Sequence, residues 1–319
     1  MRIFIGLLLM VFFFACDTSS TIESEIEKIP VNVDVVRFDE EFAAVTLEGL
    51  PELKQKYPQF FPIQYPDSIW QARLQDTLQL GLNKAVAKAF PSDDKVEDAM
   101  LPLFQHIKYY FPQFKEPSIV TTTSFVDYQA KVIVTDTLMI VALDTYLGRD
   151  HEFYSGISAY IRKNLDVSQL ASDAAGEYAR QLVKRPAERS LLAQMVTYGK
   201  ELYLKQLWLP DHTDAQIMGY TEEEMAWSYA NETEIWRYFI DRELLFSTDA
   251  KLLPRFIYNA PFTKFNLELD NDSPGMLGRY IGWQIVRSYM ERTDLEPREL
   301  LLINPEELYN KSKYKPAKN

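Results

Sequence analysis

The acidic residue best placed for chemistry is Glu177, in the run GEYAR at residues 176–180. Asp173 lies one turn earlier on the same face of a predicted helix, so one carboxyl group could act as a general acid and the other as a general base. That chemistry requires burial that raises the pKa of Glu177. The alternative is an ion pair with Arg180 or Lys184 across the helix surface, and we expect this pairing.

This chain has few residues that could bind a metal ion, and its three histidines are widely separated. The run HEFYS at residues 151–155 begins like the zinc-binding motif H-E-x-x-H, but a serine, a poor zinc ligand, stands at its fifth position. We expect His106 to pack within an aromatic-rich helix and His212 to lie in a solvated loop. The run DND at 270–272 lacks the spacing of an EF-hand loop and predicts a turn that leads into a helix. We therefore predict no metal site and no cofactor.

A second group of candidate residues combines tryptophans with carboxylates. Trp227, Asn231 and Glu234 are spaced to share one face of a helix, and so are Glu232 and Trp236. Tryptophans beside carboxylates can form a pocket, although core packing explains aromatic side chains more often than ligand binding does. We name Trp227, Asn231, Glu232 and Trp236 as the residues of a possible groove.

The composition predicts an acidic globular protein. Of the 319 residues, 47% are apolar and 13% are aromatic, which is enough to bury a large core. The formal net charge is -12 at pH 7. Because phosphate binding needs a basic face, this charge argues against nucleic acid as a partner.

The N-terminus is typical of an exported protein with a lipid anchor. Arg2 precedes an apolar run over residues 3–15, which is too short to span a bilayer and suits a signal peptide. Cys16, the only cysteine, directly follows a small residue, as in a bacterial lipobox. We predict that residues 1–15 are the signal peptide and that acylated Cys16 anchors the mature chain to a membrane. The alternative is an ordinary signal peptide followed by a chance cysteine.

The rest of the chain divides into a short tether and one domain. Residues 16–28 are polar and acidic and are predicted to be a tether, whereas residues 29–319 contain no low-complexity linker and are predicted to form a single globular domain. Residues 31–38 alternate apolar and polar side chains, which predicts a strand, followed by a helix from Asp39. Residues 119–143 are rich in threonine, valine and isoleucine and predict three short strands.

Helical patterns dominate the remaining sequence. Residues 67–90 predict a helix, and residues 168–206 predict two helices joined by a short turn. Within residues 273–290 a helix is predicted in which Gly278 and Gly282 lie one turn apart, so another helix could approach closely on that face. With strands early and helices late, the chain is predicted to be α+β and mainly helical, with a small antiparallel or mixed sheet in its N-terminal half.

Several longer phrases carry a resemblance to a known family. They are LDTYLGRDHEFY at 143–154, GYTEEEMAWSYANETEIWRYF at 219–239, RFIYNAPFTKF at 255–265, SPGMLGRYIGWQIVRSYM at 273–290 and KSKYKP at 311–316. Together with the lipobox and the loop KYPQFFP, their shared order resembles the gliding-motility lipoprotein family GldB of Bacteroidetes. The resemblance covers essentially the whole mature chain.

That family is in turn similar to zincin-like peptidases with an H-E-Y-H-H helix followed by an E-G-x-A-E helix. Against these motifs Glu177 and Tyr178 match, while Gly176 and Arg180 stand where histidines would be. Tyr198, just before a glycine, stands in the place of the ligand glutamate. The resemblance thus implies a degenerate zincin-like site, marked by Glu177, Tyr178 and Tyr198, without its three metal ligands. The possible groove would then border the old cleft and could hold a peptide or a partner segment without cleaving it.

The function implied by the resemblance is a non-catalytic lipoprotein that supports gliding motility and the associated type IX secretion machinery. It would do so through contacts with other envelope proteins, anchored by lipid to the outer membrane and facing the periplasm. The alternative is a divergent hydrolase or peptidase that acts through Glu177 with a non-standard metal or with none. The supply of metal ligands distinguishes the two hypotheses, and this chain offers few.

Overall fold

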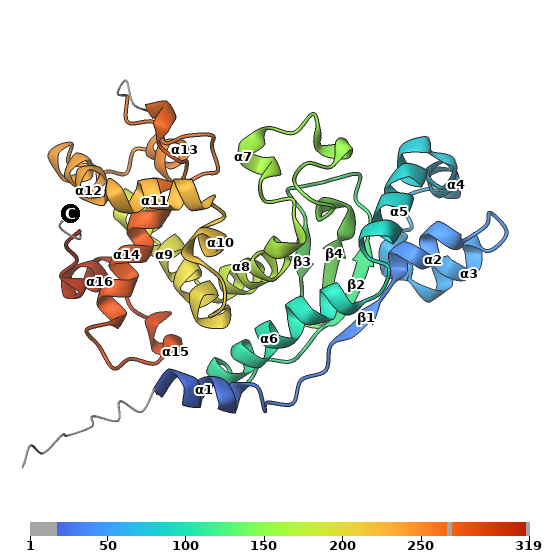
Figure 1. Ribbon diagram of the computed structural model, residues 1–319, viewed down its shortest axis with the longest axis horizontal. Coiled ribbons are helices and arrows are strands. Elements are labelled where there is room, and N and C mark those ends of the chain that lie inside the picture. The colour runs from blue at the N-terminus through green and yellow to red at the C-terminus, as the bar shows by residue number, and fades with distance from the viewer. Residues whose placement is uncertain (1–17, 267–269, 317–319) are drawn as a thin grey trace, which may run out of the picture.

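A four-stranded mixed sheet lies in the N-terminal half of the chain, and helices make up most of the rest (Figure 1). The computed structural model describes residues 18–266 and 270–316. The predicted α+β class, with its small sheet first and its helices later, is confirmed. The strands are β1 (Asp34–Val36), β2 (Ser118–Thr122), β3 (Val132–Val134) and β4 (Leu138–Ala142).

The sheet has the strand order β1-β2-β4-β3. Strand β2 runs parallel to both β1 and β4, and β3 runs antiparallel to β4 at the edge. Ile119 lies opposite Val35 on one side and Met139 on the other, and the side chains of Ile119 and Met139 are fully buried. The three strands expected within residues 119–143 are therefore present, since β-branched side chains suit a pleated, buried surface.

The first strand is shorter than the alternation over residues 31–38 predicts. Only Asp34–Val36 pairs with β2, and helix α2 (Phe38–Ala44) begins just before the predicted start at Asp39. Phe38 belongs to a cluster of aromatic rings and stacks on Phe60 with ring centroids 4.6 Å apart. Burial of this ring, a tertiary contact that no local pattern encodes, favours the early start of the helix.

The helical pattern over residues 67–90 forms two helices where one was expected. Asp76 has an extended backbone, and its carboxylate accepts a hydrogen bond of 2.9 Å from the backbone N–H of Gln79. Asp76 therefore ends one helix and caps the next. The helices before and after this break are α3 (Leu50–Lys56), α4 (Asp67–Gln75), α5 (Thr77–Ala89) and α6 (Asp94–Tyr110).

The predicted acidic tether is largely a helix that packs on the fold. Helix α1 (Thr18–Ile26) lies against α6, and Ile26 is fully buried. The amide of Gln105 donates hydrogen bonds to the backbone carbonyls of Glu27 and Ile29. Residues 18–26 of the predicted tether therefore form a helix packed on α6. The acidic composition of this segment gave no sign of a packed helix, because only one face of a short helix needs apolar side chains.

The helical C-terminal half follows the sheet. The two helices expected within residues 168–206 are present as α8 and α9. The bounds are α7 (Ala159–Arg162), α8 (Leu170–Leu182), α9 (Leu191–Trp208), α10 (Asp214–Met218), α11 (Glu222–Ala230), α12 (Glu232–Asp241), α13 (Leu252–Phe256), α14 (Leu277–Met290), α15 (Pro297–Leu300) and α16 (Pro305–Ser312).

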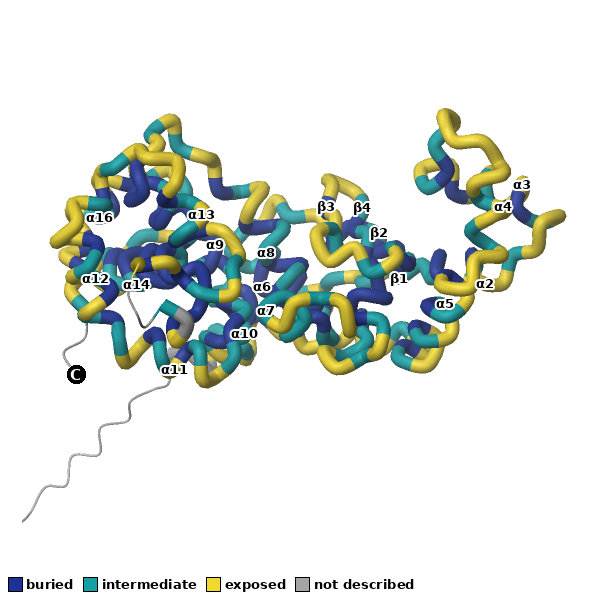
Figure 2. Tube along the Cα trace, turned by 90° about the horizontal axis from the view of Figure 1, so that it is seen from above, coloured by how far each residue is buried: buried dark blue, intermediate teal, exposed yellow. Residues whose placement is uncertain are grey.

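Helices α9 and α14 form the centre of the helical half, and both are buried along most of their length (Figure 2). Gly199 of α9 faces Gly282 of α14, where a Cβ atom on either glycine would overlap the backbone of the other helix. Gly278 meets the backbone of Phe256 in the same way. The close helix approach predicted from Gly278 and Gly282 is confirmed. A second, smaller core of aromatic and aliphatic side chains lies under α2 and α3.

Candidate functional site

Glu177 and Tyr178 both belong to helix α8, but their side chains lie in different surroundings. Glu177 forms an ion pair with Arg180, which confirms the structural pairing expected from the sequence. Burial raises the pKa of the Glu177 carboxyl group, and the charge of Arg180 opposes that shift. Tyr178 is buried in the core against Phe114, with ring centroids 5.3 Å apart. Its hydroxyl group has no hydrogen-bond partner among the described residues.

Tyr198 on helix α9 lies between two guanidinium groups. The carbon at the centre of the Arg185 guanidinium is 4.5 Å from the centroid of the Tyr198 ring, and that of Arg279 is 4.2 Å away. Glu201, one turn further along α9, forms an ion pair of 3.1 Å with Arg185. Within the described part of the chain, no side-chain hydrogen bond, ion pair or ring contact joins any two of Glu177, Tyr178 and Tyr198. The three residues of the degenerate site therefore occupy separate environments.

Two of the three histidines, His106 and His151, have structural contacts. His106 is buried, and its ring nitrogens lie 2.8 Å from the carbonyl oxygen of Pro102 and 3.0 Å from the carboxylate of Glu23. His151 accepts a hydrogen bond from the backbone N–H of Phe153 and so caps a single 3-10 turn. Across residues 18–266 and 270–316, no three His, Cys, Asp or Glu side chains are grouped in a way that could hold a metal ion.

The run at 270–272 forms a 3-10 turn ahead of α14, as expected. The Asp270 carboxylate accepts hydrogen bonds from the backbone N–H groups of Phe265 and Asn266, at 3.1 and 2.8 Å. Both carboxylate oxygens of Asp270 are therefore used to hold the backbone of the preceding loop.

The four residues of the possible groove do not line one groove. Asn231 interrupts the predicted helix, because it stands between the end of α11 and the start of α12. Trp227 and Asn231 line a small pocket of about 330 Å³, together with Glu234, Tyr238 and Phe265 among others. The expected face formed by Trp227, Asn231 and Glu234 is therefore present, in spite of the break between the helices.

Glu232 and Trp236 belong to a different environment, at the C-terminal end of the chain. The carboxylate of Glu232 accepts hydrogen bonds from the hydroxyl groups of Tyr280, at 2.5 Å, and Tyr314, at 2.8 Å. Trp236 packs edge-on against Tyr314, with ring centroids 5.1 Å apart. Both oxygens of Glu232 are engaged, so this residue ties the C-terminal segment to α12 and α14.

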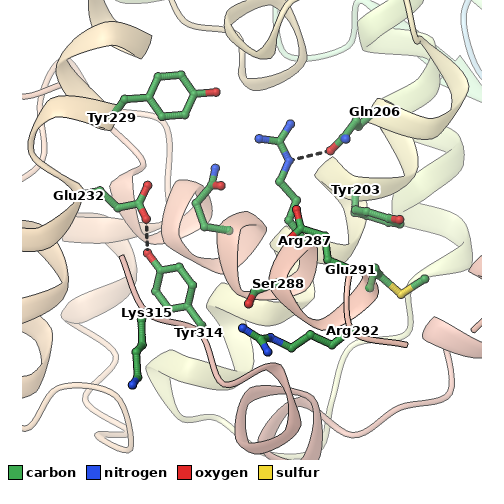
Figure 3. A pocket seen from close by; sticks show the side chains of 12 residues that line it. Tyr203, Gln206, Tyr229, Glu232, Arg287, Ser288, Glu291, Arg292, Tyr314 and Lys315 are labelled. Carbon is green, nitrogen blue, oxygen red and sulfur yellow. Dashed lines mark hydrogen bonds between the residues drawn. The ribbon is translucent and has the colours of Figure 1, made fainter. Parts of the chain in front are cut away.

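Figure 3 shows the pocket into which Glu232 faces, with a volume of about 660 Å³. Arg287 lies across it and donates a 2.8 Å hydrogen bond to the side-chain oxygen of Gln206. The same guanidinium group makes two hydrogen bonds of 2.6 Å to Asp214. Arg287 is therefore neutralised by Asp214, and the carboxylate of Glu232 is held by two tyrosine hydroxyl groups.

A third pocket, which we call the central pocket, was not predicted from the sequence. It has a volume of about 490 Å³ and lies where α7, α8, α9 and α14 meet. Asp173 of α8 and Lys205 of α9 both line it, and Gly176 lies against the aliphatic part of Lys205. Glu177, by contrast, does not line it. In a sequence, lysine and arginine at helical spacing usually indicate a solvated surface. No signal in the sequence therefore marked Lys205 as a residue that lines a pocket.

A lipoprotein family model described as gliding motility protein GldB matches residues 19–316. Neither the curated proteins nor the solved structures include a match. In the part of the chain that the structure describes, no helix is long and apolar enough to cross a membrane.

Proposed function

Because the chain belongs to the family of gliding motility protein GldB, we propose that it supports gliding as a non-catalytic lipoprotein of the cell envelope. In this proposal it assists the associated type IX secretion machinery through contacts with other envelope proteins. The family match over residues 19–316 is the observation that carries the proposal, since it spans almost all of the described chain.

The proposed anchor is a lipid on Cys16, which lies outside the described residues. Helix α1 begins at Thr18, almost directly after this cysteine, and packs on α6. A lipid at Cys16 would therefore hold the folded body close to the membrane surface, with little free chain between them. We place the protein at the outer membrane with its folded body in the periplasm.

A non-catalytic role agrees with the surroundings of the residues that resemble a peptidase site. Glu177 is held by Arg180, and Tyr178 and Tyr198 face other groups. The second candidate function is a hydrolase that acts through Glu177. It is favoured by one observation, the burial that raises the pKa of the Glu177 carboxyl group toward that of a general base.

The test is restoration of gliding in a strain that lacks the gene. Full-length Glu177→Gln is expected to restore gliding to the wild-type level, because the proposal gives this carboxylate no catalytic role. Arg180→Gln is the matched control, since it breaks the same ion pair and leaves the carboxylate in place. Loss of gliding with Glu177→Gln alone, at normal protein abundance, would favour the hydrolase.

The anchor is tested in the same strain with Cys16→Ala. This variant has no thiol to acylate, so it is expected to leave the membrane fraction and to lose gliding. Gliding at the wild-type level with the protein absent from membranes would overturn the proposed anchor.

A further inference from the structure

The central pocket is enclosed by segments that are far apart in the sequence. Its lining includes residues of α7, α8, α9 and α14, and Figure 1 shows α8 below α7. The lining contains many side chains with amide or hydroxyl groups, which are Tyr128, Gln129, Tyr160, Asn164, Gln169, Ser172 and Asn259. At about 490 Å³, the volume is in the range of pockets that bind small molecules.

Lys205 brings a positive charge into this pocket without forming an ion pair there. Its ammonium group donates a 2.6 Å hydrogen bond to the carbonyl oxygen of Ile217. No ion pair joins it to an acidic residue within the described chain. Burial lowers the pKa of Lys205 to about 8, so the side chain is mostly charged at neutral pH. A hydrogen-bonded ammonium ion in a polar pocket still has donors for a further acceptor, since it carries three N–H groups.

Arg279 brings a second positive charge to the same lining. Its Nε donates a 2.6 Å hydrogen bond to the carbonyl oxygen of Ile257, and its guanidinium plane lies over the Tyr198 ring. Within the described residues no carboxylate is in ion-pair contact with Arg279. Burial lowers the pKa of the Arg279 guanidinium group, the charge of Glu201 opposes this shift, and Glu201 itself is paired with Arg185.

One carboxylate lines the pocket, and it is already neutralised. Asp173 forms an ion pair with Lys131, and it accepts a 2.9 Å hydrogen bond from the hydroxyl group of Tyr146. Outside the lining, Glu177 is paired with Arg180. Lys205 and Arg279 therefore form no ion pair within the described chain, and Asp173 and Glu201 act on them only from beyond ion-pair distance. This arrangement occurs in a protein whose net charge is -12.

We propose that the central pocket binds the oxyanion group, a carboxylate or a phosphate, of a small polar ligand, with Lys205 and Arg279 as its cationic partners. Charge-assisted hydrogen bonds from both cations would hold the oxyanion. The amide and hydroxyl groups of the lining would contact the rest of the ligand. This inference does not depend on the role in motility.

The test is isothermal titration calorimetry on the full chain in uncharged detergent at pH 7. Three probes separate the possible sources of the oxyanion, namely N-acetyl-alanyl-alanine with a free carboxylate, the same dipeptide as its C-terminal amide, and inorganic phosphate. The free carboxylate, the phosphate or both are expected to bind, and the amide is not. Equal binding of the amide, or no binding of either anion up to about 10 mM, would overturn the proposal.

Variants locate the binding. Lys205→Met is expected to weaken binding about tenfold, which corresponds to the loss of one charge-assisted hydrogen bond. Lys95→Met is the matched control, because Lys95 also donates to a backbone carbonyl, that of Ala89, but lies on the exposed start of α6. Binding that is unchanged in Lys205→Met would place the anion elsewhere.

Gln129 offers a second pair of variants that does not disturb buried contacts, because its side chain is exposed at the pocket. Gln129→Lys is expected to strengthen binding of the anion about threefold, and Gln129→Glu to weaken it by a similar factor. These variants keep the proposal testable if Lys205→Met does not fold. Changes of the same sign in both, or no change in either, would contradict the assigned site.

Discussion

Lys200 is a residue of a charged type whose side chain lies in the core of this protein. It lies on α9, and its side chain is buried where α9 meets the C-terminal helices. Its ammonium group donates a 2.6 Å hydrogen bond to the carbonyl oxygen of Ile303. Burial lowers the pKa of Lys200 to about 8, because the charged form loses its hydration.

This shift predicts a stability that rises with pH. The folded pKa lies below the unfolded value of about 10.4, so between about pH 8 and pH 9.5 the unfolded chain binds more protons than the folded chain. The free energy of unfolding should therefore increase across this window, and Lys205 should contribute in the same direction. In Lys200→Met the increase should be smaller, by on the order of 1 kcal/mol.

Urea denaturation at several pH values measures this effect. The window ends below the pKa of an ordinary tyrosine, because buried tyrosines such as Tyr178 oppose the trend at higher pH. The exposed Lys95→Met variant should keep the full increase. An identical pH dependence in Lys200→Met and the wild type would show that burial does not shift the pKa of this lysine.

At the scale of elements, the contact between α9 and α14 sets the geometry of the helical half. Gly199 and Gly282 allow the two backbones to approach until no side chain fits between them. The same pair of helices carries Lys205 and Arg279 into the central pocket. The close approach of the helices therefore also determines the distance between the two cations.

Gly282→Ala is predicted to destabilise the protein strongly. Its Cβ would overlap the carbonyl oxygen of Met195, and the overlapping atoms belong to the backbone, which cannot rotate away. We expect the free energy of unfolding to fall by at least about 3 kcal/mol in chemical denaturation. Gly156→Ala is the matched control, since an added Cβ there meets no atom within 4 Å, and it should change stability by less than about 0.5 kcal/mol. Similar losses in both variants would argue against a role for the helix contact.

At the scale of the whole molecule, negative charge dominates while the central pocket is locally positive. The net charge is -12, yet Lys205 and Arg279 face the pocket without paired carboxylates in the described chain. A positive pocket in an acidic protein favours anions that are small enough to enter, and the negative surroundings disfavour large polyanions. The same charge distribution disfavours the binding of a divalent cation in the central pocket.

The supply of ligands predicts weak zinc binding by the whole protein. Full-length protein in detergent, exposed to zinc and then dialysed, is expected to retain well under one equivalent by elemental analysis. A peptidase with an intact H-E-x-x-H motif should remain loaded when it is treated alongside. Stoichiometric zinc would contradict this prediction and would direct mutation to His151, His212 and Glu177.

Local sequence patterns were sufficient to predict the structure where interactions between neighbouring residues along the chain determine it. The two helices around Gly176 and Gly199 follow from apolar periodicity. The ion pair of Glu177 with Arg180 is also local, since one helical turn joins them. The zincin-like relation, the single domain and the lipid anchor stay predictions, and Cys16 lies outside the described residues.

Only the tertiary structure decided which of the polar residues share a site. Asp173, Lys205 and Arg279 come from three helices, and their meeting depends on the packing of α8, α9 and α14. Trp227 and Glu232, which were predicted to share one groove, line different pockets, and the helix break at Asn231 stands between them. The sequence by itself determined long helices such as α8, α9 and α14 and the family resemblance, because these depend on neighbours and residue order. Charge pairing and pocket formation depend on contacts between distant segments, which periodicity does not encode.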